Sequence, residues 1–425
     1  MFTSLKGLTQ KKNKDLRHRL YFTLAILTIF IIGTTIEVPG TQKITKSLGF
    51  LELLNVMSGG SLRNFSIFAL GVSPYINASI IVQLLQMDII PYFSDLAKQG
   101  HTGQQKLNQI TRYIGIIFGF LQGYAMSFYF LGSSNGIFNN LKVALVLTAG
   151  TALLMWLGDQ VTQKGIGNGI SLLIMAGIVI SLPNMMKTAF QALIVTDTTK
   201  TLTIGILSFV AFLIVYLLVI VGIIYIEGAE RRINIQYANK STASLGKQSY
   251  MPIKINSAGV IPVIFASTLL SVPQTIAQFI NKEGFTNFVD TYLDYTKPFG
   301  FTLFVVLIFF FAYFYTFVQL KPDDMAKNLQ DNGGYVPGVK PGEKTAKYFK
   351  TIISRLTIAG ALFLSIIAAM PIIVNAVTKL PKTVSLGGTS LLIVVGVAIE
   401  TYKQLESSLL SRNYSVNKNY RRVRR

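Results

Sequence analysis

The sequence predicts an all-α integral membrane protein with ten transmembrane helices, and three observations support this fold class. Of the 425 residues, 51% are hydrophobic and only 13% are charged, whereas soluble proteins carry about 25% charged residues. Apolar blocks recur along the chain, and their lengths approach the roughly 20 residues that an α-helix needs to cross a bilayer core of about 30 Å. Basic residues gather between alternate blocks. We therefore expect most of the apolar surface to face lipid.

The ten predicted spans differ in polarity. Six are plainly apolar: 20–36, 113–130, 143–158, 202–226, 301–320 and 356–375. Four carry Asn, Gln, Ser, Thr, Pro or Gly within the apolar run: 74–90, 170–186, 257–280 and 386–402. No small-residue cleavage site follows the first block, which indicates a permanent span rather than a cleaved signal. An even number of spans places both termini on the same side of the membrane.

The distribution of basic residues predicts the orientation. If the N-terminus is cytoplasmic, the inside segments hold 29 of the 39 Lys and Arg residues and the outside segments hold 10. Cytoplasmic loops of membrane proteins carry such an excess. The prediction is a cytoplasmic N-terminal segment (1–19), cytoplasmic loops 225–255 and 321–355, and a basic cytoplasmic tail (406–425).

The composition disfavours several functional classes. The chain has no cysteine, which removes disulfides, thiolate metal sites and cysteine catalysis. His18 and His101 lie far apart in polar stretches, where solvated loop residues are more common than metal ligands. The net charge of +21 occurs in short runs between apolar blocks, which does not suit a DNA-binding face. Gly165–Gly169 lacks the ending of a phosphate-binding loop and predicts a tight turn. We expect no enzyme activity, metal or cofactor.

Two semi-polar spans and a short segment give information on the interior of the protein. Asn77 and Gln83 lie within 74–90, and polar residues in a span usually face protein or a water-filled path. These spans therefore indicate an aqueous interior or a seam where helices part, although polar contacts between packed helices remain an alternative. The preceding segment, Ser58–Gly71, is too short to span and has glycines at both ends. It is either re-entrant or an interfacial loop.

Two loop regions are candidates for contact with a partner. The Gly- and Pro-rich stretch 332–342 predicts a rigid tip that exposes Tyr335, Val336 and Lys340. Such a tip suits docking on an acidic or RNA-bearing partner, and a plain connecting loop is the alternative. Near the exit of one span, Glu227 and Glu230 precede a pair of arginines, which predicts a solvated charge cluster.

Six stretches in a fixed order resemble the SecY/Sec61-alpha family of protein-conducting channels. They are FALGVSPYINASI (68–80), MWLGDQ (155–160), GIGNGI (165–170), AGVIPVIFAS (258–267), VPGVKPGEKTA (336–346) and GGTSLLIV (387–394). The resemblance implies two inverted five-helix halves, 20–186 and 200–405, around an hourglass pore. It implies the bacterial channel subunit, which conducts unfolded polypeptides across the cytoplasmic membrane and laterally into it. A secondary transporter, or an accessory Sec paralogue or insertase with few substrates, is the alternative.

The resemblance also implies site residues and partners. The implied plug is the segment 58–70, with Ser58, Gly59, Gly60, Arg63, Phe65 and Leu70. The implied pore ring is Val72, Ile76, Ile170, Ile174, Ile264 and Ile393. The implied lateral gate has Asn77, Gln83, Asn256 and Val272, and the implied docking residues are Arg231, Arg232, Tyr335 and Lys340. The family commonly has Arg where this chain has Lys340. The implied partners are SecE-type and SecG-type subunits, a SecA-type ATPase motor, the ribosome, polypeptides with signal sequences and the lipid bilayer, but not DNA.

Overall fold

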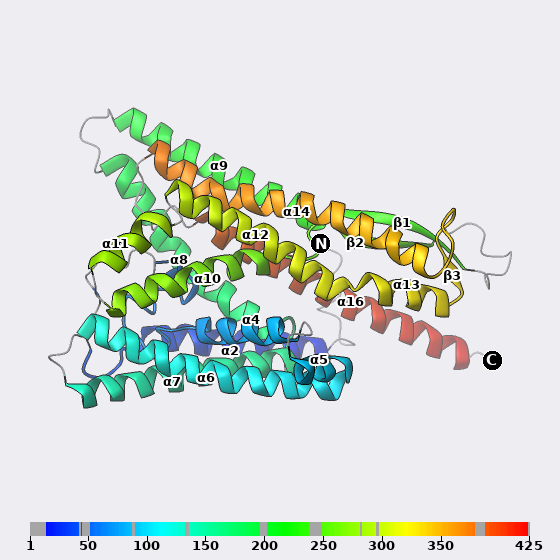
Figure 1. The fold of residues 1–425 in the computed structure, drawn as a ribbon, viewed down its shortest axis with the longest axis horizontal. Coiled ribbons are helices and arrows are strands. Elements are labelled where there is room, and N and C mark those ends of the chain that lie inside the picture. Colours follow the sequence, from blue (N-terminus) through cyan, green and yellow to red (C-terminus); the bar gives the residue numbers. More distant parts are fainter. Residues whose placement is uncertain are drawn as a thin grey trace. The chain divides into compact units, whose positions relative to one another are not determined.

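A computed structural model of the chain describes residues 14–41, 44, 52–86, 90–131, 136–195, 202–237, 249–280, 283–294, 297–378 and 387–423. Over this part of the chain each of the ten predicted spans coincides with a helix, although the ends of the spans 74–90 and 386–402 extend into residues outside it (Figure 1). Seven described helices are long and apolar enough to cross a membrane, and the helices Ser73–Leu85 and Ile261–Ile280 contain shorter apolar stretches. The chain is a multi-pass membrane protein.

The chain divides into two compact units, residues 1–189 with 397–425 and residues 190–396. The first unit contains α2 (Lys14–Thr35), α3 (Glu52–Met57), α4 (Ser73–Leu85), α5 (Pro91–Lys98), α6 (His101–Leu131), α7 (Ile137–Lys164) and nearly all of α8 (Gly169–Phe190). The second contains the π-helix η4 (Gln191–Val195), α9 (Leu202–Gly228), β1 (Glu230–Tyr237), β2 (Ser249–Lys254), α10 (Ile261–Ile280), α11 (Glu283–Tyr292), α12 (Pro298–Leu320), α13 (Pro322–Asp331), β3 (Gly334–Tyr335) and α14 (Glu343–Thr378).

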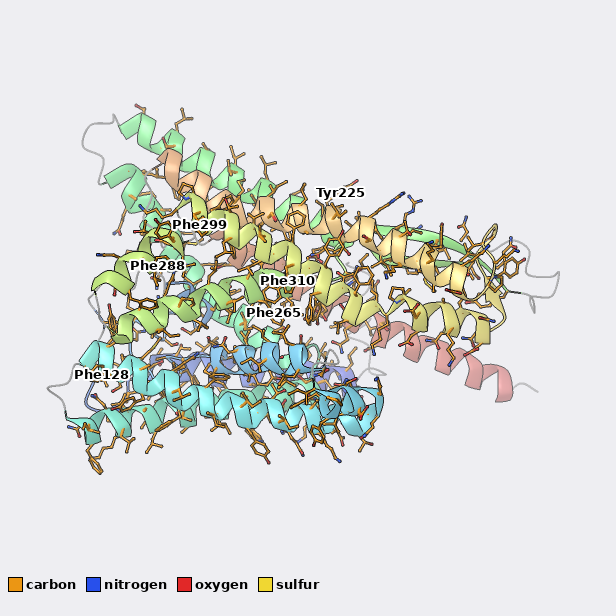
Figure 2. All side chains as sticks on the ribbon, viewed as in Figure 1. Phe128, Tyr225, Phe265, Phe288, Phe299 and Phe310 are labelled. Atoms are coloured by element: carbon orange, nitrogen blue, oxygen red, sulfur yellow. The ribbon has the colours of Figure 1, made fainter. Side chains whose placement is uncertain are left out.

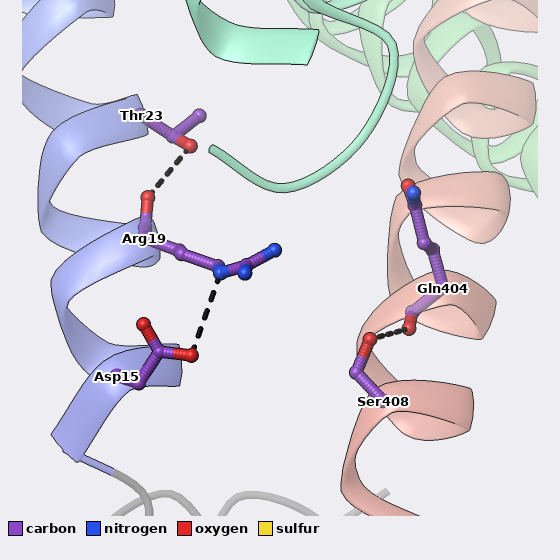
Figure 3. A network of polar contacts seen from close by, with 5 residues as sticks. All are labelled: Asp15, Arg19, Thr23, Gln404 and Ser408. Atoms are coloured by element: carbon purple, nitrogen blue, oxygen red, sulfur yellow. Dashed lines mark hydrogen bonds and ion pairs between the residues drawn. The ribbon is translucent and has the colours of Figure 1, made fainter. Parts of the chain in front are cut away.

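The last helix, α16 (Gly387–Val423), begins in the second unit and continues in the first from Val397. In the first unit Leu409 packs with Leu16 of α2 and Ile166 of the turn between α7 and α8. Figure 3 shows this end of α2 beside α16: Asp15 and Arg19 form an ion pair of 3.6 Å, and Ser408 donates to the carbonyl of Gln404. Helix α16 runs to Val423, so it extends through most of the predicted tail 406–425, whose cytoplasmic side stays a prediction. The inverted relation between the halves stays a prediction.

Small residues bring the helices of the first unit close together. Three glycines spaced four residues apart on α6 face α4 and α7, namely Gly115, Gly119 and Gly123. A Cβ atom at Gly123 would lie 3.2 Å from the carbonyl oxygen of Ala144 on α7. In membranes such small residues allow backbones to approach, since lipid provides no hydrophobic drive for helix association.

The second unit packs α10, α12 and α14 together through aromatic and small residues. Phe265 of α10 meets Phe311 of α12 edge-to-face, with ring centroids 5.6 Å apart. Helix α9 differs, because only 6% of its most apolar 18-residue stretch is buried. This exposure suits a plainly apolar span that faces lipid.

A small antiparallel sheet is an element that the all-α prediction lacked. Its strand order is β2-β1-β3, so the loops predicted at 225–255 and 321–355 meet in one structure. Ile233 and Ile235 of β1 are buried against Phe349 of α14 and its neighbours. The middle of the first loop, 238–248, lies outside the described residues.

Candidate functional site

The segment 58–70 is folded on itself. Its two ends approach each other, since a Cβ at Gly71 would lie 3.3 Å from the Cβ of Ser58. Inside the segment, the Ser61 hydroxyl donates to the carbonyl of Phe68 over 2.8 Å. At its base, the Arg63 amide donates to the side-chain oxygen of Asn55 over 3.0 Å. These bonds supply partners for a backbone that has no regular secondary structure, as burial away from water requires.

The segment 58–70 is also buried within the first unit. The exposed fractions of Leu62, Phe65 and Ser61 are 0%, 1% and 0%. The Phe65 carbonyl accepts from the amide of Val38 and the Ile67 amide donates to Ile36, both over 3.0 Å. A loop spread on the surface would leave these side chains uncovered. The segment is therefore an internal element of the first unit and not an interfacial loop on its surface.

Helix α8 forms one wall against this segment. A Cβ at Gly177 would collide with the carbonyl oxygen of Met57, and a Cβ at Gly59 would lie 3.3 Å from the Cα of Gly177. One turn further on, the Ser181 hydroxyl donates to the carbonyl of Val56 over 3.1 Å. The two backbones touch here because Gly177 has no side chain.

Four of the predicted pore-ring residues lie in the first unit, on α8 and at the start of α4. Ile170 and Ile174 lie on the same stripe of α8 as Gly177, since residues three or four apart in a helix are neighbours. Val72 lies two residues after the segment and directly before α4, and the Ile76 amide donates to its carbonyl over 3.1 Å. Val72, Ile76 and Ile174 are buried, and Ile170 is half-buried.

The other two predicted ring residues lie on adjacent helices of the second unit. A Cβ at Gly396 of α16 would lie 3.1 Å from a side-chain carbon of Val260, just before α10. Ile393 precedes Gly396 by three residues and Ile264 follows Val260 by four, so both lie near this contact. The structure thus groups the ring residues within each unit, and their joint ring stays a prediction.

The four predicted gate residues differ in their surroundings. Asn77 and Gln83 on α4 have side-chain carbonyl oxygens that are buried without a hydrogen-bond partner among the described residues, and so has Gln274 on α10. The side-chain nitrogens of Gln83 and Gln274 do have partners, the Ser79 hydroxyl and the Leu293 carbonyl, so polar contacts between packed helices remain an alternative to an aqueous seam. Val272 is exposed, and its role in a gate stays a prediction.

Asn256, the fourth predicted gate residue, lies in a buried polar joint. Its side-chain amide donates to a carboxylate oxygen of Glu227 over 2.6 Å and to the carbonyl of Gly259 over 3.1 Å. Glu227 is 8% exposed, so the prediction that it belongs to a solvated charge cluster is wrong. A buried carboxylate needs such partners, because a charge without them is costly away from water. Glu230 is exposed as predicted.

The predicted docking residues lie on or beside the sheet. Arg232 forms an ion pair of 2.9 Å with Glu230 and lies over the ring of Tyr250, 4.8 Å from its centroid. The hydrogen bond to Glu230, followed by the charges of Tyr250 and Glu230, raises the pKa of the Arg232 guanidinium above its ordinary value. Arg231 is exposed too, but neighbouring residues of a strand point to opposite faces, so the two arginines do not share one face.

The tip 332–342 joins this sheet through β3. The Tyr335 hydroxyl donates to the side-chain oxygen of Gln236 on β1 over 2.8 Å, and Lys340 is exposed. Val336 was expected to be exposed, but it is 4% exposed and packs in the core beneath the sheet with Phe349. The tip is therefore anchored from below by an apolar residue, while its tyrosine and lysine face outward.

Some site residues are not apparent from the sequence. Arg112 of α6 and Asp159 of α7 form an ion pair of 2.7 Å, although they are distant in the chain. The sequence also does not indicate the close contact at Gly177, because glycines are common in membrane helices. His18 and His101 are exposed as expected, but they lie in helices rather than loops. Among the described residues no group of three His, Cys, Asp or Glu side chains is placed to hold a metal.

Comparison with known proteins agrees with this geometry. The family model SecY matches residues 66–402. A protein translocase subunit SecY of Bacillus licheniformis is 45% identical over 94% of this chain and 96% of its own length. One from Staphylococcus epidermidis is 48% identical, over 94% and 96%.

Solved structures show the same fold at lower identity. A protein-conducting channel has a TM-score of 0.65 and 19% identity, with 92% of each chain covered. Sec61 in a canine ribosome–channel complex has a TM-score of 0.61 and 19% identity, again with 92% of each chain covered. With a family model that spans most of the sequence and relatives this similar along nearly all of it, the chain belongs to the SecY family.

Proposed function

We propose that this chain is the channel-forming subunit of a protein translocase, which conducts unfolded polypeptides across the bacterial cytoplasmic membrane and releases apolar segments sideways into it. The observation that carries the proposal is the buried segment 58–70, which lies against α8 at Gly177, while four buried or half-buried aliphatic residues lie on α8 and at the start of α4. Relatives of similar length are named protein translocase subunits, and the secondary-transporter alternative is not favoured.

The physical roles follow from these residues. Branched aliphatic side chains disfavour water in a narrow bore and still deform around a passing chain, so Val72, Ile76, Ile170 and Ile174, with Ile264 and Ile393, act as a gasket. The segment 58–70 acts as a plug that closes the idle path. The side-chain oxygens of Asn77 and Gln83, which are buried without a partner among the described residues, suit a gate helix that meets water or a passing signal sequence when the gate opens. No bond chemistry is assigned to these residues.

Disulfide capture of a translocating chain tests this function. The chain has no cysteine, so Ile174→Cys introduces a single thiol at the proposed gasket. We expect a substrate with one cysteine, stalled during translocation, to form a disulfide with residue 174. The matched control is Leu218→Cys on α9, whose side chain is 65% exposed on a lipid-facing span. Equal capture at both positions, or none at 174, would show that the substrate does not pass along α8.

The proposed topology has both termini in the cytoplasm. Its support is the excess of basic residues, 29 against 10, on the segments that it places inside. The sheet and its tip then face the cytoplasm. The docking experiment below also bears on this orientation, since only a cytoplasmic tip meets a cytoplasmic partner.

The sheet and its tip are the proposed docking surface for an energy source, either a SecA-type ATPase or a translating ribosome. The basic, exposed Arg232 and Lys340 and the aromatic Tyr250 and Tyr335 support this role. Lysine attracts a phosphate or carboxylate as a point charge but lacks the two parallel N–H donors of arginine. Lys340 therefore recognises the charge of a partner group and not its bidentate geometry. SecE-type and SecG-type subunits complete the proposed complex.

Reversing the charge at the tip should weaken docking. For Lys340→Glu we expect the affinity for the motor to fall roughly tenfold or more, because like charges across an interface cost several kcal/mol. Motor-driven export in proteoliposomes should fall with it, while the amount of assembled channel stays unchanged. Lys106→Glu reverses an exposed charge on α6, outside the sheet, and should leave export near the parent level. Unchanged export by Lys340→Glu would remove the tip from the docking surface.

A further inference from the structure

Helix α11 (Glu283–Tyr292) is a short amphipathic helix between α10 and α12, at the end of the second unit opposite the sheet (Figure 1). Phe285, Phe288, Val289 and Tyr292 occur at positions i, i+3, i+4 and i+7, which places them on one stripe. Asn287 and Thr291 are exposed beside it. The channel function described above does not use this helix.

One edge of the stripe is covered and the rest is open. Val289 is 1% exposed, and the Thr286 hydroxyl donates to the carbonyl of Ala277 on α10 over 3.5 Å. In contrast, Phe285, Phe288 and Tyr292 are 37%, 51% and 47% exposed. The helix is therefore seated on α10, and three aromatic side chains remain uncovered, one of which, Phe288, is labelled in Figure 2.

These aromatic side chains continue the surface of a membrane span. The rings of Phe288 and Tyr292 are 5.1 Å apart, and Tyr292 meets Phe299 of α12 edge-to-face at 5.9 Å. Phe299 and Phe310 of α12 are 59% and 57% exposed, and α12 lies in one of the apolar helices long enough to cross a membrane. The surface that α12 presents to lipid thus extends onto α11 without interruption.

The position of Phe299 along α12 shows how far these aromatic side chains lie from the centre of the bilayer. The midpoint of α12 (Pro298–Leu320) is residue 309, which follows Phe299 by ten residues. At 1.5 Å per residue this is about 15 Å. Half of a bilayer core is also about 15 Å. Phe299, Tyr292 and Phe288 therefore lie at the boundary between acyl chains and headgroups.

The connection between α11 and α12 fixes this level. A Cβ at Gly300 would collide with the carbonyl oxygen of Asp294, so α12 begins directly against the end of α11. The Lys297 amide donates to the same carbonyl over 2.9 Å, and the Gln274 side chain of α10 donates to the Leu293 carbonyl over 3.2 Å. With these three contacts in place, α11 does not swing away from the span.

We propose that α11 is an interfacial helix whose open aromatic face inserts among lipid acyl chains at the membrane boundary. Amphipathic helices with an aromatic face bind lipid in this way, and aromatic rings gather at this level of membrane proteins. The helix carries Glu283 and Asp290 and no basic residue, so apolar contact rather than anionic lipid drives its insertion. On the topology proposed above, this is the outer leaflet.

Spin-label accessibility in proteoliposomes of zwitterionic lipid tests the proposal. The cysteine-free chain allows single nitroxide labels at Phe288→Cys and Tyr292→Cys on the aromatic face, with Asn287→Cys as the control on the polar face. A label at Phe310→Cys reports the middle of the lipid-facing span. The measured quantity is the logarithm of the ratio of collision with oxygen, which favours lipid, to collision with a water-soluble nickel complex.

We expect a positive logarithm at 288 and 292, below the value at 310, and a negative logarithm at 287. A negative value at 288 and 292 with a positive value at 310 would show that α11 stands in water, which overturns the proposal but leaves the channel function intact. Low collision with both reagents at 288 and 292 would show that protein covers the face, which overturns it too. A negative value at 310 would instead contradict the assignment of α12 as a membrane span.

Discussion

Replacing Ile76, Ile174 and Ile264 together by serine should make the idle channel conduct ions. The proposed gasket keeps water out of a narrow bore, and hydroxyl groups there would hold water in place. Losing even about 1.4 kcal/mol of the preference for the dry state raises the wetted population roughly tenfold. Planar-bilayer recordings should show resting or flickering currents that the parent lacks. Export of proteins with defective signal sequences should also rise, because less binding energy is needed to open the path.

The control for this variant keeps the apolar volume. Leucine at the same three positions should retain the seal, because volume-conserving aliphatic changes usually cost less than about 1.5 kcal/mol. Thermal unfolding of both triple variants reports whether the fold survives. A folded triple-serine variant that is as tight to ions as the parent would place the seal elsewhere, most directly in the segment 58–70.

Gly177→Ala should release the segment 58–70. A Cβ at this position would collide with the carbonyl oxygen of Met57 and would reach within 3.0 Å of the Gly59 amide. Overpacking of this kind typically costs about 1–3 kcal/mol. We expect the segment to move off α8, which should increase resting ion conductance and open the buried Ser61 to solvent.

A thiol at Ser61 measures that movement. Ser61 is fully buried and close in size to cysteine, so Ser61→Cys should react slowly with maleimide in the parent and several-fold faster with Gly177→Ala. Gly222→Ala on α9 is the matched control, because no heavy atom lies within 4 Å of the added Cβ. An unchanged rate at Ser61 in the Gly177→Ala protein would mean that α8 gives way instead and that the segment is not held by this contact.

The spans and the tertiary contacts differ in how far the sequence predicts them. An apolar stretch such as 202–226 predicts its own helix, because its length and hydrophobicity meet the requirement of the bilayer locally. The segment 58–70 left two interpretations open, since it packs against residues far along the chain, among them Leu147 and Gly177. The role of a glycine in a close contact appears only when its partner is known.

The sheet was not predicted from the sequence for a different reason. Ile233 and Ile235 alternate with polar residues, but β1 pairs with β2 across residues 238–248 and with only two residues of β3. Strands this short in a polar loop carry a weak signal. The errors at Glu227 and Val336 have the same origin, because each was judged from charged or Gly- and Pro-rich neighbours while its burial comes from distant residues.

The joint between Glu227 and Asn256 has a mechanical consequence. The Ile255 amide donates to the Ala229 carbonyl over 3.1 Å, the Asn256 amide holds Glu227, and the backbone of Gly360 on α14 presses against the Ile255 carbonyl. Six residues connect the end of β2 to the start of α10, and these contacts fix the first two of them. A displacement of the sheet should therefore also displace the first turn of α10, because the segment that connects them is held in place and does not act as a flexible linker.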